Sequence, residues 1–149
     1  EYCRETNPGM GLACNTNGSL RNPAWWSRLG AVMREDQNLG NYCTFSLDGL
    51  EDTNHLYRRN TNWKKIMENA QAFINAGGVA HWDYIVFEHN EHQVDACELL
   101  ARDIGFSWFR AKVSKRDLLG TTLQMPNNWQ APVLVDGKIN CHALNESSA

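Results

Sequence analysis

The chain has 149 residues, of which 42% are hydrophobic and six are tryptophan. This length and composition predict one folded domain with a packed core and argue against a disordered chain. The net charge of −3 argues against a nucleic-acid partner and an anionic membrane surface. No stretch approaches the roughly 18 consecutive apolar residues of a membrane span.

The first predicted elements are a strand, a helix and a second strand. The apolar run at 11–15 predicts a short buried strand. Asn22 and Pro23 provide a helix cap and a first helical residue, and apolar residues continue at helical spacing as far as Met33. A β-prone run over 42–47 predicts the second strand.

The alternation continues along the chain. A second helix begins near 61–62 and ends at Gly77 and Gly78, which favour a left-handed cap. The predicted elements that follow are a strand over 79–87, a helix over 91–104 that stops at Gly105, and a strand over 107–112. One strand–helix unit about every 30 residues is the size of a parallel crossover. The sheet is therefore α/β and parallel, either a barrel wall or an open doubly wound sheet.

After Lys112 the sequence changes character. Residues 114–128 are polar and irregular, and Asp136-Gly137 is a hairpin signal between two apolar runs. We therefore expect a first unit over 1–113, followed by a linker and the start of a different unit over 114–149. The first residues, EYCRETNPG, lack the apolar core of a secretory signal. Since there is also no initial methionine, we interpret the chain as an internal piece of a longer protein.

The five cysteines show no CxxC and no zinc-ribbon spacing. Cys14, Cys43 and Cys97 fall in strand-like or helix-like runs, where buried free thiols are the commoner finding. Reduced thiols predict an intracellular, cytoplasmic protein.

Polar side chains follow each predicted strand. Parallel α/β sheets hold their chemistry at this carboxyl edge. Turn formation alone accounts for Asn, Asp and Gly, but it does not require the Ser, His and Arg that occur here as well. The four strand ends read Asn15-Thr16-Asn17-Gly18, Ser46-x-Asp48-Gly49, Glu88-His89-Asn90 and Arg110-x-Lys112.

The standard signatures of nucleotide loops and hydrolases are absent. The sequence contains no GxGxxG, no GxxxxGK[ST] and no GxSxG. His55, His89, Glu91 and His92 are candidate metal ligands, although such a cluster beside a helix start is more often solvated surface.

Four segments resemble the radical S-adenosylmethionine (radical SAM) superfamily, and most closely its members with a SPASM or twitch extension. The segment 15–21 (NTNGSLR) resembles the Thr-Asn-Gly turn of the third barrel strand. The segment 45–61 (FSLDGLEDTNHLYRRNT) resembles the Ser-Ile/Leu-Asp-Gly motif after the fourth strand. The segment 84–106 resembles the fifth strand with its terminal asparagine, and 139–147 (INCHALNES) resembles the start of the extension.

The resemblance implies the later half of a partial (β/α)6 TIM-like barrel. It also implies an enzyme that cleaves S-adenosylmethionine reductively at a [4Fe–4S] cluster, giving a 5′-deoxyadenosyl radical that abstracts hydrogen from a peptide or small-molecule substrate. A flavodoxin or ferredoxin would be the reductant. A closed cavity suits such chemistry because the radical must not meet water.

The resemblance also assigns residues. Ser46 matches a strand-end serine that bonds the methionyl part of the cofactor, and Arg58 matches an arginine that pairs with its carboxylate, with Arg59 as the alternative. Thr16 and Asn17 would line the cavity near the ribose or substrate, and Asn90 the adenosine side. Asp48 would belong to the same cofactor-binding site and orient its loop, and Cys141 would be the first ligand of an auxiliary cluster.

Two motifs of the family are missing, the CxxxCxxC hallmark and the Gly-Gly-Glu/Asp-Pro turn of the second strand. The CxxxCxxC motif that binds the catalytic cluster does not occur in this sequence. We expect it in another part of the parent protein, so the full-length parent is expected to be active and this chain alone inactive. Two alternatives stay open. One is a non-catalytic α/β module that binds a small anionic ligand at the strand ends, and the other is an unrelated (β/α) barrel enzyme.

Overall fold

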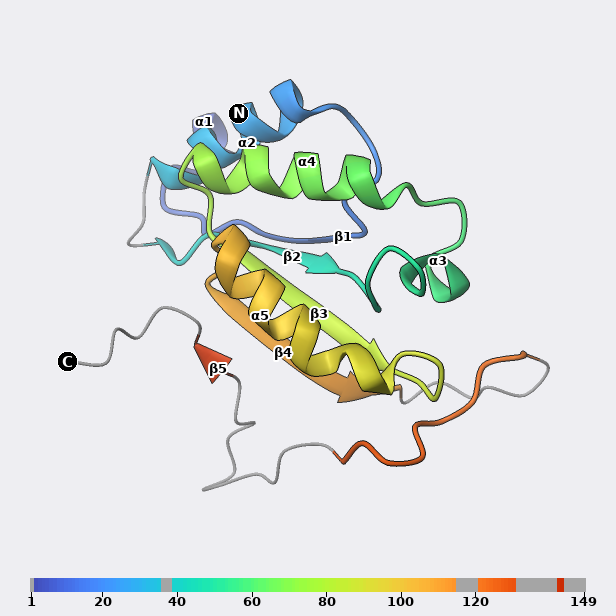
Figure 1. Cartoon of the computed structure of the whole chain (residues 1–149). Coiled ribbons are helices and arrows are strands. Elements are labelled where there is room, and N and C mark those ends of the chain that lie inside the picture. Colours follow the sequence, from blue (N-terminus) through green and yellow to red (C-terminus); the bar gives the residue numbers. More distant parts are fainter. Residues whose placement is uncertain (1, 36–38, 115–120, 131–141, 144–149) are drawn as a thin grey trace, which may run out of the picture.

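The computed structural model describes residues 2–35, 39–114, 121–130 and 142–143. Within them, helices and strands alternate and the strands form one sheet (Figure 1). The elements in chain order are α1 (Tyr2–Thr6), β1 (Ala13–Thr16), α2 (Pro23–Arg34), β2 (Tyr42–Ser46), α3 (Asn54–Tyr57), α4 (Trp63–Asn75), β3 (Ala80–Val86), η2 (Glu91–Gln93), α5 (Val94–Ile104), β4 (Trp108–Val113) and β5 (His142–Ala143).

Strands β1 to β4 are parallel and lie side by side in their sequence order. This confirms the predicted α/β class with a parallel sheet. The two-residue strand β5 pairs antiparallel with β4 and was not predicted. The predicted hairpin at 136–137 lies outside the described residues, and the division into 1–113 and 114–149 stays a prediction.

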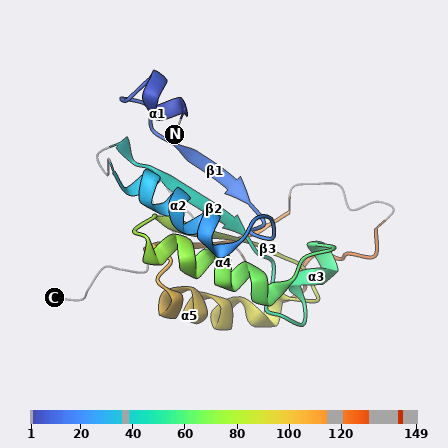
Figure 2. The same ribbon diagram turned by 90° about the horizontal axis from the view of Figure 1, so that it is seen from above.

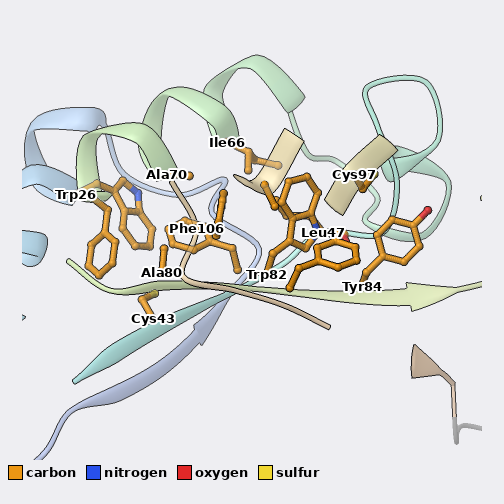
Figure 3. Close-up of a cluster of buried hydrophobic side chains, with 14 of the residues drawn as sticks. Trp26, Cys43, Leu47, Ile66, Ala70, Ala80, Trp82, Tyr84, Cys97 and Phe106 are labelled. Atoms are coloured by element: carbon orange, nitrogen blue, oxygen red, sulfur yellow. Dashed lines mark hydrogen bonds between the residues drawn. The ribbon is translucent and has the colours of Figure 1, made fainter. Parts of the chain in front are cut away.

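Helices α2, α4 and α5 pack on one face of the sheet. Each crossover leads to the next strand in the same direction, and right-handed crossovers of that kind place their helices on the same side. In β3 the buried residues alternate with half-exposed ones. Ala80, Trp82 and Tyr84 face the helices (Figure 3), and together with Val86 they belong to the core. The opposite face, which we call the open face, carries residues such as His81 and Asp83.

Helices α2 and α4 lie next to each other above the sheet (Figures 1 and 2). Their close approach depends on Gly30 of α2, because a Cβ at that position would lie 2.4 Å from the carbonyl oxygen of Phe73 in α4. The absence of a side chain at this point lets the two backbones meet.

Aromatic side chains fill the core between the helices and the sheet (Figure 3). Phe45, Phe73, Trp82 and Phe106 are fully buried, and the rings of Trp82 and Phe106 have centroids 5.3 Å apart. The indole nitrogen of Trp82 donates to the carbonyl oxygen of Leu47 at 2.8 Å, so the polar atom of this large residue is satisfied inside the core.

The predicted helix ends are largely confirmed. Asn22 caps α2 by accepting from the backbone N–H of Trp25 at 3.0 Å, and Asn62 caps α4 by accepting from that of Lys65 at 2.9 Å. Gly77 (φ 91°) and Gly105 (φ 100°) adopt left-handed backbone after α4 and α5. The helix predicted over 91–104 begins instead as the 3-10 turn η2, and the short helices α1 and α3 were not predicted.

No helix in the described part of the chain is both long enough and apolar enough to cross a membrane.

Candidate functional site

The predicted site residues lie at the carboxyl edge of the parallel sheet. Thr16 and Ser46 are the last residues of β1 and β2, and Asn90 lies in the turn that leads from β3 into η2. Strand directions therefore bring the ends of β1, β2 and β3 to one edge, as the sequence predicted. The side chains at this edge divide into those that hold the loops together and those that keep polar groups available.

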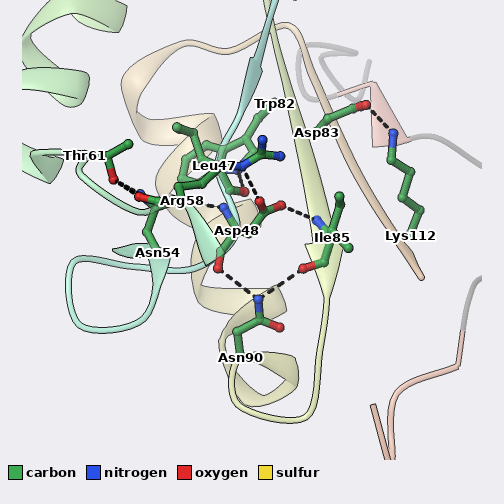
Figure 4. Close-up of polar contacts among 10 residues, drawn as sticks. All are labelled: Leu47, Asp48, Asn54, Arg58, Thr61, Trp82, Asp83, Ile85, Asn90 and Lys112. Atoms are coloured by element: carbon green, nitrogen blue, oxygen red, sulfur yellow. Dashed lines mark hydrogen bonds and ion pairs between the residues drawn. The ribbon is translucent and has the colours of Figure 1, made fainter. Parts of the chain in front are cut away.

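Asp48 connects the loops at this edge (Figure 4). Its side chain has no exposed surface, and its carboxylate accepts from Arg58 Nε at 2.5 Å and from the backbone N–H of Ile85 at 2.6 Å. Its backbone N–H donates to Asn54 Oδ1 at 2.9 Å, and its carbonyl oxygen accepts from Asn90 Nδ2 at 2.9 Å. Asp48 therefore orients its loop and positions Arg58, while its expected place in a cofactor-binding site stays a prediction.

Burial raises the pKa of Asp48, while the Arg58 guanidinium and the Ile85 N–H act in the opposite direction. A carboxylate removed from water needs such partners because its desolvation is costly. The two oxygens of Asp48 each have one, which explains why a charged side chain is tolerated in this position.

Arg58 ends α3 and is partly exposed, with 24% of its side-chain surface accessible. Its Nε is engaged by Asp48, and its guanidinium lies over the ring of Tyr57 at 5.0 Å. Among the described residues, none accepts a hydrogen bond from its two terminal nitrogens. A guanidinium held in this way can present those nitrogens together to a second carboxylate.

Asn90 is fully buried and closes the turn after β3. Its Oδ1 accepts from the backbone N–H of Phe87 at 2.7 Å, and its Nδ2 donates to the carbonyl oxygens of Asp48 and Ile85. The hydroxyl of Tyr84 donates to the Asn90 carbonyl oxygen at 2.7 Å. Both amide hydrogens of Asn90 are therefore used within the protein, and its role here is structural. Its expected contact with the adenosine side stays a prediction.

Thr16 and Asn17 form the turn after β1. The Thr16 hydroxyl accepts from the backbone N–H of Gly18 at 2.9 Å, and Asn17 Oδ1 accepts from the backbone N–H and hydroxyl of Ser19. Gly18 takes the left-handed conformation with φ 72°. These are the local bonds that Thr and Asn make in turns, and both side chains remain partly exposed.

Ser46 differs from its neighbours because its hydroxyl makes no hydrogen bond to any described residue. It is half-buried and lies on the open face of the sheet, where its register partner in β3 is Asp83. A hydroxyl at a strand end with unused bonding capacity is available to a ligand.

Asp83 is a residue that the sequence analysis missed. It accepts hydrogen bonds from Arg110 Nε at 2.9 Å and Nη2 at 2.6 Å, and from Lys112 Nζ at 2.5 Å. Burial alone would raise the pKa of Asp83, but the hydrogen bonds from Arg110 and Lys112 outweigh it and lower that pKa. The alternation of apolar and polar residues over 80–84 was the signal that could have placed Asp83 on the open face.

The candidate metal ligands His55, His89, Glu91 and His92 do not form a metal site in the described part of the chain. No group of three or more His, Cys, Asp or Glu residues there is arranged to hold a metal ion. Glu91 instead accepts from the backbone N–H of Asn128 and of Trp129, so it ties segment 121–130 to the turn after β3. Cys141 lies outside the described residues.

A large hollow on the described surface lies away from this edge. It is a groove of about 690 Å³ between α4 and α5, with Trp63, Met67, Leu100 and Ile104 among its lining residues. The groove is therefore on the outer, helical side of the sheet. The polar groups described above lie at the strand ends and on the open face.

No protein-family model matches this chain, and no curated protein matches it with significant similarity.

Proposed function

We propose that this chain forms part of the barrel of a radical SAM enzyme that carries a SPASM or twitch extension. The observation that supports this most is the arrangement of Ser46, Asp48 and Arg58. These residues occupy the resembling motif, and Asp48 holds Arg58 at the carboxyl edge by a bond of 2.5 Å. Ser46 and Arg58 keep polar groups available there, as residues that bind a cofactor must.

The sheet topology favours a barrel wall over a doubly wound sheet. In a doubly wound sheet the strand order reverses and helices cover both faces. Here the order is β1-β2-β3-β4 without reversal, and α2, α4 and α5 share one core. In a partial (β/α)6 barrel the open face, with Ser46 and Asp83, would line the interior.

The free groups of Ser46 and Arg58 fit the methionyl end of S-adenosylmethionine. The terminal nitrogens of Arg58 would hold the carboxylate in a forked pair, and the Ser46 hydroxyl would add a hydrogen bond. Asp48 fixes the guanidinium before the ligand arrives, which lowers the entropy lost on binding. Electron transfer to the bound cofactor is the chemistry that a [4Fe–4S] cluster supplies in this superfamily.

The described residues do not fit the cluster itself. Cluster ligands must converge within a short distance, and the described part of the chain contains no such group. The catalytic ligands would therefore come from outside this chain, and Cys141 would serve an auxiliary cluster. The substrate, a peptide or small molecule, and the flavodoxin or ferredoxin reductant are part of the same proposal.

The test uses a natural protein that contains this chain and a CxxxCxxC segment. After anaerobic reconstitution with iron and sulfide, we expect release of 5′-deoxyadenosine that depends on S-adenosylmethionine and on reductant. Ser46→Ala and Arg58→Lys should each weaken binding of S-adenosylmethionine about 10-fold or more, because a hydrogen bond to a charged group contributes about 1.5–3 kcal/mol. Lysine can still pair with Asp48 but cannot form the fork.

Arg59→Lys is the matched comparison, since Arg59 is the exposed neighbour of Arg58 and the alternative assignment for the carboxylate contact. It should leave the affinity unchanged. Wild-type affinity in both the Ser46 and Arg58 variants would remove the site assignment, and the absence of any 5′-deoxyadenosine from the reconstituted protein would remove the enzymatic proposal.

A non-catalytic module for a small anionic ligand is the second candidate. It is favoured by two cations, Arg110 and Lys112, that lie together on the open face and both bond Asp83. This candidate predicts that simple dicarboxylates or phosphate bind to the protein without any cofactor, and that Lys112→Gln weakens them. Binding of S-adenosylmethionine in preference to these anions would count against it.

A further inference from the structure

Two cysteines that are far apart in the sequence meet in the sheet. Cys14 of β1 and Cys43 of β2 are register partners in adjacent parallel strands, and their Sγ atoms lie 2.8 Å apart. Both are free thiols. Cys43 is fully buried beneath the helices, whereas Cys14 is only partly buried.

The backbone already meets one main requirement for a disulfide. Adjacent strands lie about 4.8 Å apart, which falls within the roughly 4.4–6.8 Å between Cα atoms that disulfides span. The two Sγ atoms must then approach from 2.8 Å to the roughly 2.05 Å of an S–S bond. Cys3, on α1, and Cys97, on α5, have no such neighbour among the described residues.

The environments of the two thiols differ, and the difference indicates that Cys14 reacts first with an oxidant and Cys43 second. Cys14 is the more accessible, and a hydrogen bond from the Cys43 thiol lowers the pKa of Cys14 even though partial burial opposes this. The same contact, together with burial, raises the pKa of Cys43 well above its ordinary value. Thiolate character and access are the two factors that make a cysteine react with oxidants.

We propose that Cys14 and Cys43 form a redox-reactive pair that peroxide converts into a disulfide joining β1 to β2. The Cys14 thiolate attacks one oxygen of hydrogen peroxide, the O–O bond breaks, and water leaves after protonation of the released hydroxide. The sulfur of Cys43 then attacks the Cys14 sulfenic acid, the S–O bond breaks, and the Cys43 proton leaves with the hydroxide as a second water. Two thiols are oxidised and one peroxide is reduced.

This pair does not depend on the proposed function. It lies on the helix side of the sheet, two residues before Thr16 in β1 and three before Ser46 in β2. The disulfide would therefore fix the spacing of these two strands two to three residues before their carboxyl ends.

The sequence allows a direct test by mass spectrometry. Trypsin releases Cys14 in peptide 5–21 and Cys43 in peptide 35–58, and each peptide contains no other cysteine. The full chain with Cys3→Ser and Cys141→Ser, which removes thiols that could join two molecules, is treated with hydrogen peroxide and then with iodoacetamide. We expect the two peptides to be recovered cross-linked, and dithiothreitol to separate them.

Three comparisons test the assigned roles. Cys97→Ser, a change at another fully buried cysteine, should give the same cross-link. Cys43→Ala should give none, and dimedone should then label Cys14 as the sulfenic acid. In urea the cross-linking should lose its preference for Cys43 and include Cys97, because the sheet that aligns the pair is absent. This comparison needs no substitution inside the core.

Recovery of both peptides with alkylated thiols after peroxide would overturn the proposal. The proposal would equally fail if Cys14 were oxidised to its sulfinic acid in the folded protein without any cross-link to Cys43.

Discussion

Replacing Asp48 with Asn tests the assigned role of the buried carboxylate directly. Asn has the same shape but only one acceptor oxygen, whereas the carboxylate of Asp48 serves two donors, Arg58 Nε at 2.5 Å and the Ile85 N–H at 2.6 Å. In either orientation of the amide, one of these donors faces an NH₂ group and loses its partner. A buried donor left without an acceptor costs about 1–3 kcal/mol.

Urea unfolding of the full chain measures this loss. With an m-value of about 2 kcal/mol per M, the expected loss lowers the midpoint by about 0.5–1.5 M at unchanged slope. Glu51→Gln is the control, because Glu51 is exposed and close by in the same loop, and surface changes of this kind stay within about 0.5 kcal/mol.

The same reasoning makes a second, sharper prediction about Asp48 and Arg58. Once Arg58→Ala has removed one of the two donors, the single amide oxygen that Asp48→Asn leaves at this position can serve the Ile85 N–H. Asp48→Asn should therefore cost much less in that background, and the double-mutant cycle should show a coupling of about 1–2 kcal/mol. Two results would refute the account of Asp48 as an acceptor for both Arg58 and Ile85. One is a urea midpoint of Asp48→Asn equal to that of wild type, and the other is an equal loss of stability from Asp48→Asn in the wild-type and Arg58→Ala proteins.

Three further predictions concern other parts of the fold. The pKa of Asp83 is lowered by Arg110 and Lys112, so its contribution to stability is present above its ordinary pKa of 3.8 and is lost as the pH falls through the folded value. The free energy of unfolding, measured by urea titration, should therefore fall more between pH 6 and pH 3 for wild-type protein than for Asp83→Asn. Parallel pH profiles of the two proteins would contradict this. Gly30→Ala should destabilise the chain in thermal unfolding, because the contact of 2.4 Å with a backbone oxygen costs about 1–3 kcal/mol and exceeds the gain of about 1 kcal/mol in helix propensity; a raised Tm would refute it. Asn22→Ala should cost about 0.5–2 kcal/mol through loss of the α2 cap, measured by the same method, and no change would show that the bond to Trp25 contributes nothing.

The sequence was sufficient for the elements whose signals are local. Asn22 and Asn62 mark helix starts because their side chains bond backbone groups only three residues away, and Gly105 marks a helix end because glycine adopts positive φ at little cost. The period of about 30 residues likewise predicted parallel crossovers. None of these inferences requires knowledge of a distant residue.

Helix α3 is an element that local sequence signals do not predict. Its four residues, Asn54–Tyr57, are too few for a helix that is stable by itself. It is held by contacts with residues from elsewhere: Asn54 accepts from the backbone of Asp48, and the Thr53 hydroxyl before it donates to Gln93 at 2.5 Å. The propensities of the segment alone could not have predicted it.

The sequence by itself determined that polar groups, Ser46 among them, would follow parallel strands and lie at their carboxyl edge, whereas the position of Arg58 was implied only by the family resemblance. Only the tertiary structure decided which groups meet: Asp83 with Lys112, and Cys14 with Cys43. Such pairs depend on strand register and on the face to which each side chain points, and these are fixed by the packing of the whole sheet against its helices. The sequence shows how residues alternate along each strand, but it does not show how neighbouring strands are aligned with each other.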